Sequence, residues 1–180
     1  PTIPRVAEDA YNKLVALNVE PSRTHLIGHS HGAHVAGLIG NAFRNNGKTI
    51  RRITALDASV EDVHVNVWLG SLVGIGGMSN FLGQSWGASK NSAAFIDFYK
   101  SSALFGGETA WGHDNFVLVE DGRLWQVGNE FRNHSYAVAW YTKTIRSSSD
   151  VDSKLGYNWA TRTAWSRYTA QLPGWGGGMP

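Results

Sequence analysis

Residues 24–45, THLIGHSHGAHVAGLIGNAFRN, constrain the fold of this chain more than any other stretch. They read as a short apolar strand, then a tight turn that carries Ser30, then a helix rich in small residues. The turn has the pattern G-x-S-x-G, with Gly28, His29 and Gly32 around the serine. We expect the glycines because a turn this sharp presses its flanking backbone against strand and helix, where a Cβ would clash. A strand, such a turn and a helix are typical of a nucleophile elbow, the bend that exposes a serine hydroxyl.

The periodicity of the rest of the chain predicts an α/β fold with a mostly parallel sheet and flanking helices. The predicted strands cover residues 24–28, 49–56 and 92–100, and the predicted helices cover residues 4–17, 33–44 and 134–145. The last segment also fits a strand by pattern, and its helical spacing favours the helix. The apolar face of the first helix is predicted from Val6, Ala10, Leu14 and Leu17.

The later segments of the chain carry less regular patterns. Residues 116–127 predict a hairpin with Asp121-Gly122 as its turn, and residues 60–90 show no sustained period. The whole of residues 1–180 is expected to form a single domain, whose residues 147–180 make a polar tail rich in Trp and Gly.

Composition excludes several classes of function. Hydrophobic residues make up 42% and charged residues 17%, which is typical of a globular domain. The net charge is only +2, and no run of basic residues exceeds Arg51-Arg52, so nucleic acid is not an expected partner. The chain has no cysteine, which excludes disulfides, thiolate metal sites and a cysteine nucleophile.

Two polar residues follow directly after predicted strands. Ser30 and Asp57 both fall at the carboxyl edge of the sheet, where open parallel sheets bind their ligands. A serine nucleophile needs a base to take its proton and an acid to orient that base. Asp57 is favoured over Asp97 as the acid, because Asp97 lies inside a strand and points to one of its faces. The candidate bases are His64, His113 and His134.

Other motifs carry weaker signals. Ser85 lies in a second G-x-S-x-G pattern, but no strand precedes it and no helix follows, so we do not expect it to be a nucleophile. His31 and His34 could share a helix face, yet no carboxylate completes a His-Glu-x-x-His pattern, so no metal site is expected. Trp68 and Trp86 fit either ordinary packing or an apolar acyl pocket.

The blocks HLIGHSHGAHVAG and RITALDAS resemble the pancreatic-lipase-like family of α/β-hydrolases, which includes lipases and phospholipases A1. The resemblance continues through AAFIDFYKSS, WGHDNF and NHSYAVAWY. Carried over position by position, it implies Ser30 as nucleophile, Asp57 as acid and His134 as base. His113 resembles a non-catalytic position of the family. The backbone N–H of His31 is implied as one donor of the oxyanion hole.

The resemblance implies a serine carboxylic-ester hydrolase that needs no cofactor or metal and acts on esters or lipids. A secreted or cell-surface location and peripheral contact with a lipid interface are also implied. The absence of cysteine suggests a bacterial relative, because animal members commonly carry disulfides.

The family has further strands before the elbow, including the loop that supplies the second oxyanion donor, and this chain does not contain them. We therefore expect either that an upstream part of the same protein completes the sheet, or that the chain is a reduced hydrolase. The alternative function is a non-catalytic binding or structural module derived from a lipase fold.

Overall fold

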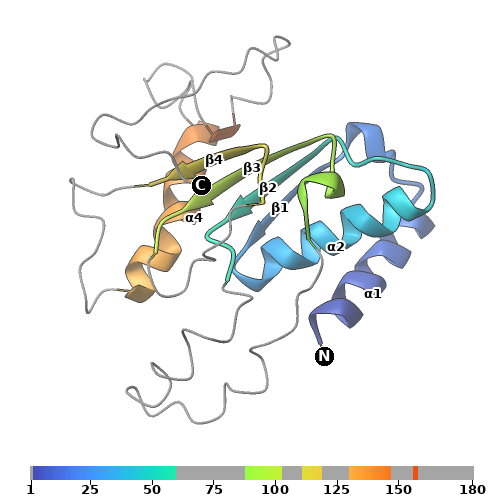
Figure 1. The fold of residues 1–180 in the computed structure, drawn as a ribbon, viewed down its shortest axis with the longest axis horizontal. Coiled ribbons are helices and arrows are strands. Elements are labelled where there is room, and N and C mark those ends of the chain that lie inside the picture. The colour runs from blue at the N-terminus through green and yellow to red at the C-terminus, as the bar shows by residue number, and fades with distance from the viewer. Residues whose placement is uncertain (1, 60–87, 103–110, 119–129, 147–155, 158–180) are drawn as a thin grey trace. The chain divides into compact units, whose positions relative to one another are not determined.

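The computed structural model describes residues 2–59, 88–102, 111–118, 130–146 and 156–157 (Figure 1). Its helices are α1 (Ile3–Ala16), α2 (His31–Asn45) and α4 (Glu130–Arg146), with short 3-10 turns η1 (Pro21–Arg23) and η3 (Lys90–Ser92). Its strands are β1 (His25–His29), β2 (Arg52–Leu56), β3 (Phe95–Lys100) and β4 (Asp114–Val117). Each predicted helix and strand other than the hairpin lies within a few residues of these bounds, and the segment that fitted either class is a helix.

The four strands form one sheet in the order β1-β2-β3-β4, and every neighbouring pair is parallel. Gly28 lies opposite Ala55, and Ala55 lies opposite Phe98. The predicted α/β class with a parallel sheet and flanking helices is therefore confirmed. The predicted hairpin lies mostly outside the described residues; its first residues, Phe116 and Val117, belong to β4 and pair with β3.

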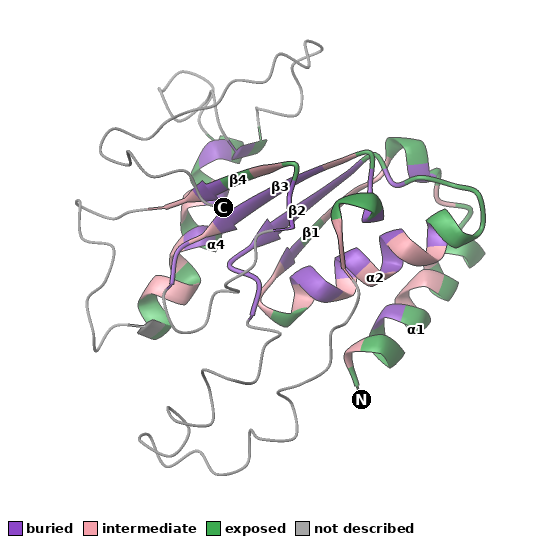
Figure 2. Cartoon of the chain, viewed as in Figure 1, coloured by how far each residue is buried: buried purple, intermediate pink, exposed green. Residues whose placement is uncertain are grey.

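Helix α2 packs its small residues against one face of the sheet (Figure 2). The buried cluster on this face combines helix residues with alternate strand residues: Ala33, Ala36, Ile39, Phe43, Ile53, Ala55, Ile96 and Phe98. Gly40 allows α2 to lie close to the turn η3 that precedes β3, because a Cβ there would lie 2.0 Å from the carbonyl oxygen of Ser92. Close packing of α2 fixes its first turn, which follows Ser30, relative to the strand ends.

Helix α1 packs beside α2 on the same side of the sheet (Figure 1). The ring of Tyr11 meets the ring of Phe43 edge-on, with centroids 4.8 Å apart, and Ala7 is buried. Val6 and Leu17, which were predicted on the apolar face, are 39% and 62% exposed, so that part of the prediction is wrong. The buried stripe is rotated to Ala7, Ala10, Tyr11 and Leu14, because the large ring of Tyr11 reaches the core.

The opposite face of the sheet carries a different set of side chains. Tyr99 stacks against Phe116 at 4.9 Å and meets Trp140 of α4 at 5.1 Å between ring centroids. Since successive strand residues point to opposite faces, the neighbouring Phe98 belongs to the α2 face and Tyr99 to the α4 face. Through Trp140, α4 thus covers Tyr99 near the carboxyl end of β3.

Contacts group the chain into two units, residues 1–140 and residues 141–180. In the second unit, the hydroxyl of Thr144 donates to the carbonyl of Tyr141 at 2.7 Å and accepts from the N–H of Tyr157 at 3.0 Å. The single-domain prediction stays a prediction. Within the described ranges, no helix combines the length and the apolar character needed to cross a membrane.

Candidate functional site

Ser30 occupies the turn between β1 and α2. Its backbone has φ 55° and ψ −126°, a region that non-glycine residues rarely adopt. Such strain persists only where the surrounding structure enforces it, and it is frequent at active sites. Here the N–H of Ser30 donates to the carbonyl of Leu56 at 3.0 Å, and the carbonyl of Ser30 accepts from the N–H of Ala33 at 3.1 Å. The turn therefore has the geometry expected of a nucleophile elbow.

The two glycines of the turn differ in their need to be glycine. A Cβ on Gly28 would lie 2.2 Å from the carbonyl oxygen of Gly32, so a side chain there is excluded, as predicted. Among the residues that the structure describes, a Cβ on Gly32 would meet nothing within 4 Å. The predicted clash at Gly32 is therefore wrong for the described surroundings of this residue, which already lies in the first turn of α2.

Asp57 follows β2 directly and is fully buried. Its backbone also has a positive φ, 42°, and its N–H donates to the carbonyl of Tyr99 at 2.6 Å. One carboxylate oxygen, Oδ1, accepts the backbone N–H groups of Ser101 at 2.6 Å and Ser102 at 2.9 Å. The other, Oδ2, accepts from the hydroxyl of Ser102 and from the ring of His134. Four donors thus converge on one carboxylate.

These donors keep the carboxylate ionised. Burial raises the pKa of Asp57, but the hydrogen bonds from His134, Ser102 and Ser101 outweigh it and bring the pKa below its ordinary value. A buried acid that stays charged at neutral pH can orient a neighbouring imidazole and stabilise its protonated form.

His134 lies in the first part of α4, with its Nδ1 2.6 Å from Oδ2 of Asp57. A carboxylate can only accept, so Nδ1 carries the proton and Nε2 is left as an acceptor. This is the tautomer that a general base requires. The His134 side chain is 15% exposed. Among the residues described, no hydrogen bond joins the hydroxyl of Ser30 to His134; such contacts are often long before substrate binds.

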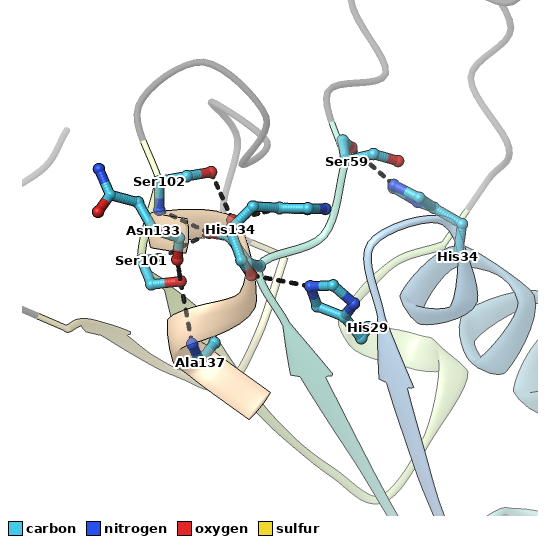
Figure 3. A network of polar contacts seen from close by, with 9 residues as sticks. His29, His34, Ser59, Ser101, Ser102, Asn133, His134 and Ala137 are labelled. Carbon is cyan, nitrogen blue, oxygen red and sulfur yellow. Dashed lines mark hydrogen bonds and ion pairs between the residues drawn. The ribbon is translucent and has the colours of Figure 1, made fainter. Parts of the chain in front are cut away.

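Two more histidines flank the serine. The ring Nε2 of His29 donates to the backbone carbonyl of His134 at 2.8 Å, and the two rings lie 4.4 Å apart between centroids (Figure 3). Burial lowers the pKa of His31, and the electrostatic effects of His34 and His134 lower it further, so its ring is neutral at pH 7. As the first residue of α2, His31 presents its backbone N–H at the positive end of the helix dipole.

His34 and Ser59 join α2 to the segment that follows Asp57. The ring Nε2 of His34 donates to the carbonyl of Ser59 at 2.8 Å, and both residues are buried (Figure 3). His34 therefore packs locally. Among the residues that the structure describes, no group of three or more histidines, aspartates, glutamates or cysteines could hold a metal ion.

Asp97, the alternative to Asp57 as the acid, takes part in a separate hydrogen-bond network. Its carboxylate accepts hydrogen bonds from Nε of Arg52 at 3.0 Å and from Nη2 of Arg52 at 2.5 Å. It also accepts a hydrogen bond from the hydroxyl of Thr54 at 2.7 Å. That hydroxyl also lies 2.8 Å from Nε2 of His25. Arg52, Thr54 and Asp97 are buried and lie within their strands, before the carboxyl ends, so Asp97 is a structural residue.

His113, a discarded base, is likewise structural. Its Nδ1 accepts the backbone N–H of Ile96 at 3.0 Å, and its ring stacks on Phe95. Burial and the nearby charge of Lys90 lower the pKa of His113, which keeps the ring neutral in this role.

Several predicted residues lie outside the described part of the chain: Trp68, Trp86, Ser85 and His64. The acyl pocket and the second G-x-S-x-G motif therefore stay predictions. A cavity of about 450 Å³ does lie within the described residues, lined among others by Pro21, Phe43 and Lys48. Most of its lining residues come shortly before β1 or β2 in the chain, so it lies toward the amino ends of these strands, whereas Ser30 and Asp57 follow their carboxyl ends.

Ser101 and Ser102 were not among the residues predicted to form the site. The signal was nevertheless present, because the two serines come directly after β3 at the same carboxyl edge as Asp57. Hydroxyl and N–H donors at that position bind the acid of the neighbouring strand.

Residues 5–64 match the protein-family model described as Lipase. The matched segment contains β1, α2 and β2, and with them Ser30 and Asp57; His134 lies beyond it. The match supports a lipase-family relationship for this chain, and with it the general class of lipase-like hydrolases acting on ester or lipid substrates.

Proposed function

We propose that this chain, given the lipase-family relationship of its residues 5–64, is a serine carboxylic-ester hydrolase. Ser30 is the nucleophile, His134 the general base and Asp57 the orienting acid. The observation that carries the proposal is the 2.6 Å hydrogen bond between His134 and the buried carboxylate of Asp57, at the sheet edge where Ser30 lies in a strained turn.

Acylation uses each of these groups. The Oγ of Ser30 attacks the ester carbonyl carbon while Nε2 of His134 takes its proton. The carbonyl oxygen of the tetrahedral intermediate becomes negatively charged and accepts a hydrogen bond from the backbone N–H of His31. Collapse of the intermediate transfers the proton from His134 to the leaving alcohol and leaves the acyl group on Ser30. Asp57 stays ionised throughout, which its four hydrogen-bond donors favour.

Deacylation repeats the sequence with water. His134 takes a proton from water, the hydroxide attacks the acyl carbon, and the carboxylic acid leaves as Ser30 recovers its proton. The cycle uses no cofactor or metal.

The substrate class follows from the family relationship. We propose acyl-glycerols, phospholipids or smaller esters, bound in an apolar acyl pocket that includes Trp68 and Trp86. Peripheral contact with a lipid interface and a secreted or cell-surface location belong to the same proposal. We further propose that the chain is related to the pancreatic-lipase-like members of the lipase family, because the proposed acid directly follows β2. A bacterial origin fits the lack of cysteine.

We also propose that a preceding part of the protein pairs with β1. Among the described strands β1 lies at one edge of the sheet, and the side chain of Ile27 is 48% exposed. The N–H of Ser30 and the carbonyl of Thr24 form hydrogen bonds toward β2. Because the backbone groups of successive strand residues point to alternate sides, the N–H and carbonyl of Ile27 point away from β2, to the outer edge. An added strand would bring the loop with the second oxyanion donor, which is worth about 100- to 1000-fold in rate.

A fluorophosphonate probe, which reacts only with activated serines, tests the nucleophile directly. We expect labelling of the wild-type protein and of Ser85→Ala, and none of Ser30→Ala. Ser85→Ala is the matched control, because Ser85 occupies the other G-x-S-x-G motif. The comparison is run with and without the preceding part of the protein, and the second oxyanion donor predicts faster labelling when that part is present.

Two outcomes would sink the proposal. One is equal labelling of Ser30→Ala and wild type. The other is no labelling of the wild type even with the preceding part present, which would leave a non-catalytic binding or structural module.

A further inference from the structure

We propose that Ser101 is a positioning residue that couples the acid and the base of this site. The inference rests on the proposed function. Ser101 comes directly after β3, is buried, and makes hydrogen bonds in two directions (Figure 3). Its backbone holds the carboxylate of Asp57, and its side chain holds the helical turn that carries His134.

The side-chain bonds place Ser101 inside a turn of α4. Its hydroxyl donates to the carbonyl of Asn133 at 2.6 Å and accepts from the N–H of Ala137 at 3.2 Å. Those two backbone groups are the pair that an α-helix joins between residues four apart. The Ser101 hydroxyl therefore bonds to both ends of one helical turn, and His134 lies within that turn.

The backbone bond acts on the acid. The N–H of Ser101 donates to Oδ1 of Asp57 at 2.6 Å, while the ring of His134 donates to Oδ2 of the same carboxylate. One residue thus fixes the carboxylate from one side and the backbone of its partner histidine from the other. The adjacent Ser102 contacts the carboxylate through its N–H at 2.9 Å and its hydroxyl, and its hydroxyl does not bond to α4. Of this pair of described residues, Ser101 is the one whose hydrogen bonds reach both partners.

Ser101→Ala separates these two functions, because it removes the hydroxyl and leaves the N–H to Asp57 in place. Ser101→Cys removes the strong hydrogen bonds while keeping most of the volume, so that a packing defect can be told apart from lost positioning. The chain offers a matched control in Ser92, which is also buried. Its hydroxyl likewise donates once, to Asn41 at 2.9 Å, and accepts once, from the N–H of Ser89 at 3.1 Å.

We expect kcat for a p-nitrophenyl ester to fall about 10- to 100-fold in both Ser101 variants, because a misplacement of about 1 Å in a catalytic group can cost that much. KM should change little, since the Ser101 side chain is turned into α4. Ser92→Ala and Ser92→Cys should lower the melting temperature comparably and leave kcat unchanged.

The Nδ1 proton of His134 gives a readout independent of turnover. In a 2.6 Å hydrogen bond to a carboxylate it should give a low-field proton NMR signal. We expect this signal to shift or broaden in the Ser101 variants and to persist in the Ser92 variants. An unchanged signal, or a kcat loss no larger than that of the Ser92 variants, would overturn the positioning role. If the wild type turns over no ester, the proposed function fails, and the signal still decides the inference.

Discussion

Replacing Asp57 with asparagine should move the ring proton of His134 from Nδ1 to Nε2 while leaving the shape of the site nearly intact. The two carboxylate oxygens of Asp57 have different partners. Oδ1 receives the backbone N–H groups of Ser101 and Ser102, neither of which can reverse its role. Oδ2 receives the ring of His134 and the hydroxyl of Ser102, and both of these partners can become acceptors.

The side-chain amide of the Asp57→Asn variant therefore has one acceptable orientation. Its oxygen must face the two N–H groups, because an NH₂ group there would oppose two donors at less than 3 Å. Its NH₂ group then faces Nδ1 of His134, which has to give up its proton and accept. The proton moves to Nε2, and the ring can no longer take the proton of Ser30. An inverted tautomer of this kind costs about 10⁴-fold in kcat in the serine protease triad, and we expect a loss of that order.

The assay is single-turnover acylation by a p-nitrophenyl ester, at pH 7 to 9, with Asp97→Asn as the control. Asp97 is a buried carboxylate outside the site, so its variant should lose stability through the contact with Arg52 and keep the acylation rate of its folded fraction. Acylation by Asp57→Asn within about 10-fold of wild type would contradict the tautomer argument.

Two further predictions concern stability. Burial, aided by Arg52 and opposed by Asp97, lowers the pKa of His25 from 6.5 to about 4, so below pH 6.5 the unfolded chain binds a proton that the folded chain does not. Urea unfolding should show that lowering the pH from 7.5 to 5 costs the wild type about 2 kcal/mol more than His25→Gln, and equal losses would refute the burial of a neutral ring. Gly28→Ala should lower the free energy of unfolding by at least about 2 kcal/mol through its clash with Gly32. Gly32→Ala should leave the free energy of unfolding unchanged or raise it by up to about 1 kcal/mol. Equal effects of the two substitutions in thermal unfolding would contradict the different surroundings of the two glycines.

The sequence predicted the strands and helices that place the site, because their signals are local. The turn around Ser30 and the position of Asp57 at a strand end follow from hydrophobic periodicity and from the rule that parallel strands end at one edge. His134 could not be reached in that way. Three histidines were candidates from the residues alone, and the resemblance favoured His134; the structure brings it to Asp57.

Two of the misses share a physical cause, which is that long-range contacts leave no periodic signal. The bond between Ser101 and the turn of His134 spans 32 positions, and nothing in the local pattern announces it. The rotated face of α1 has the same origin, since the contact of Tyr11 with Phe43 decides which stripe is buried. Gly32 is a miss of another kind, because the G-x-S-x-G pattern treats two glycines alike that have different surroundings.

The strand order explains why the proposed acid can follow the strand next to the proposed nucleophile. β1, β2 and β3 are neighbours both in sequence and in the sheet, so their carboxyl ends lie side by side at about 4.8 Å per step. The first end carries Ser30, the second Asp57, and the third the donors Ser101 and Ser102. An acid after β3 would lie one strand farther from Ser30, and its own backbone donors would have to come from the end of β4. With Asp57 on the middle of the three strand ends, one neighbouring strand carries Ser30, the proposed nucleophile, and the other supplies donors to Oδ1, so that Oδ2 can accept from His134 of α4.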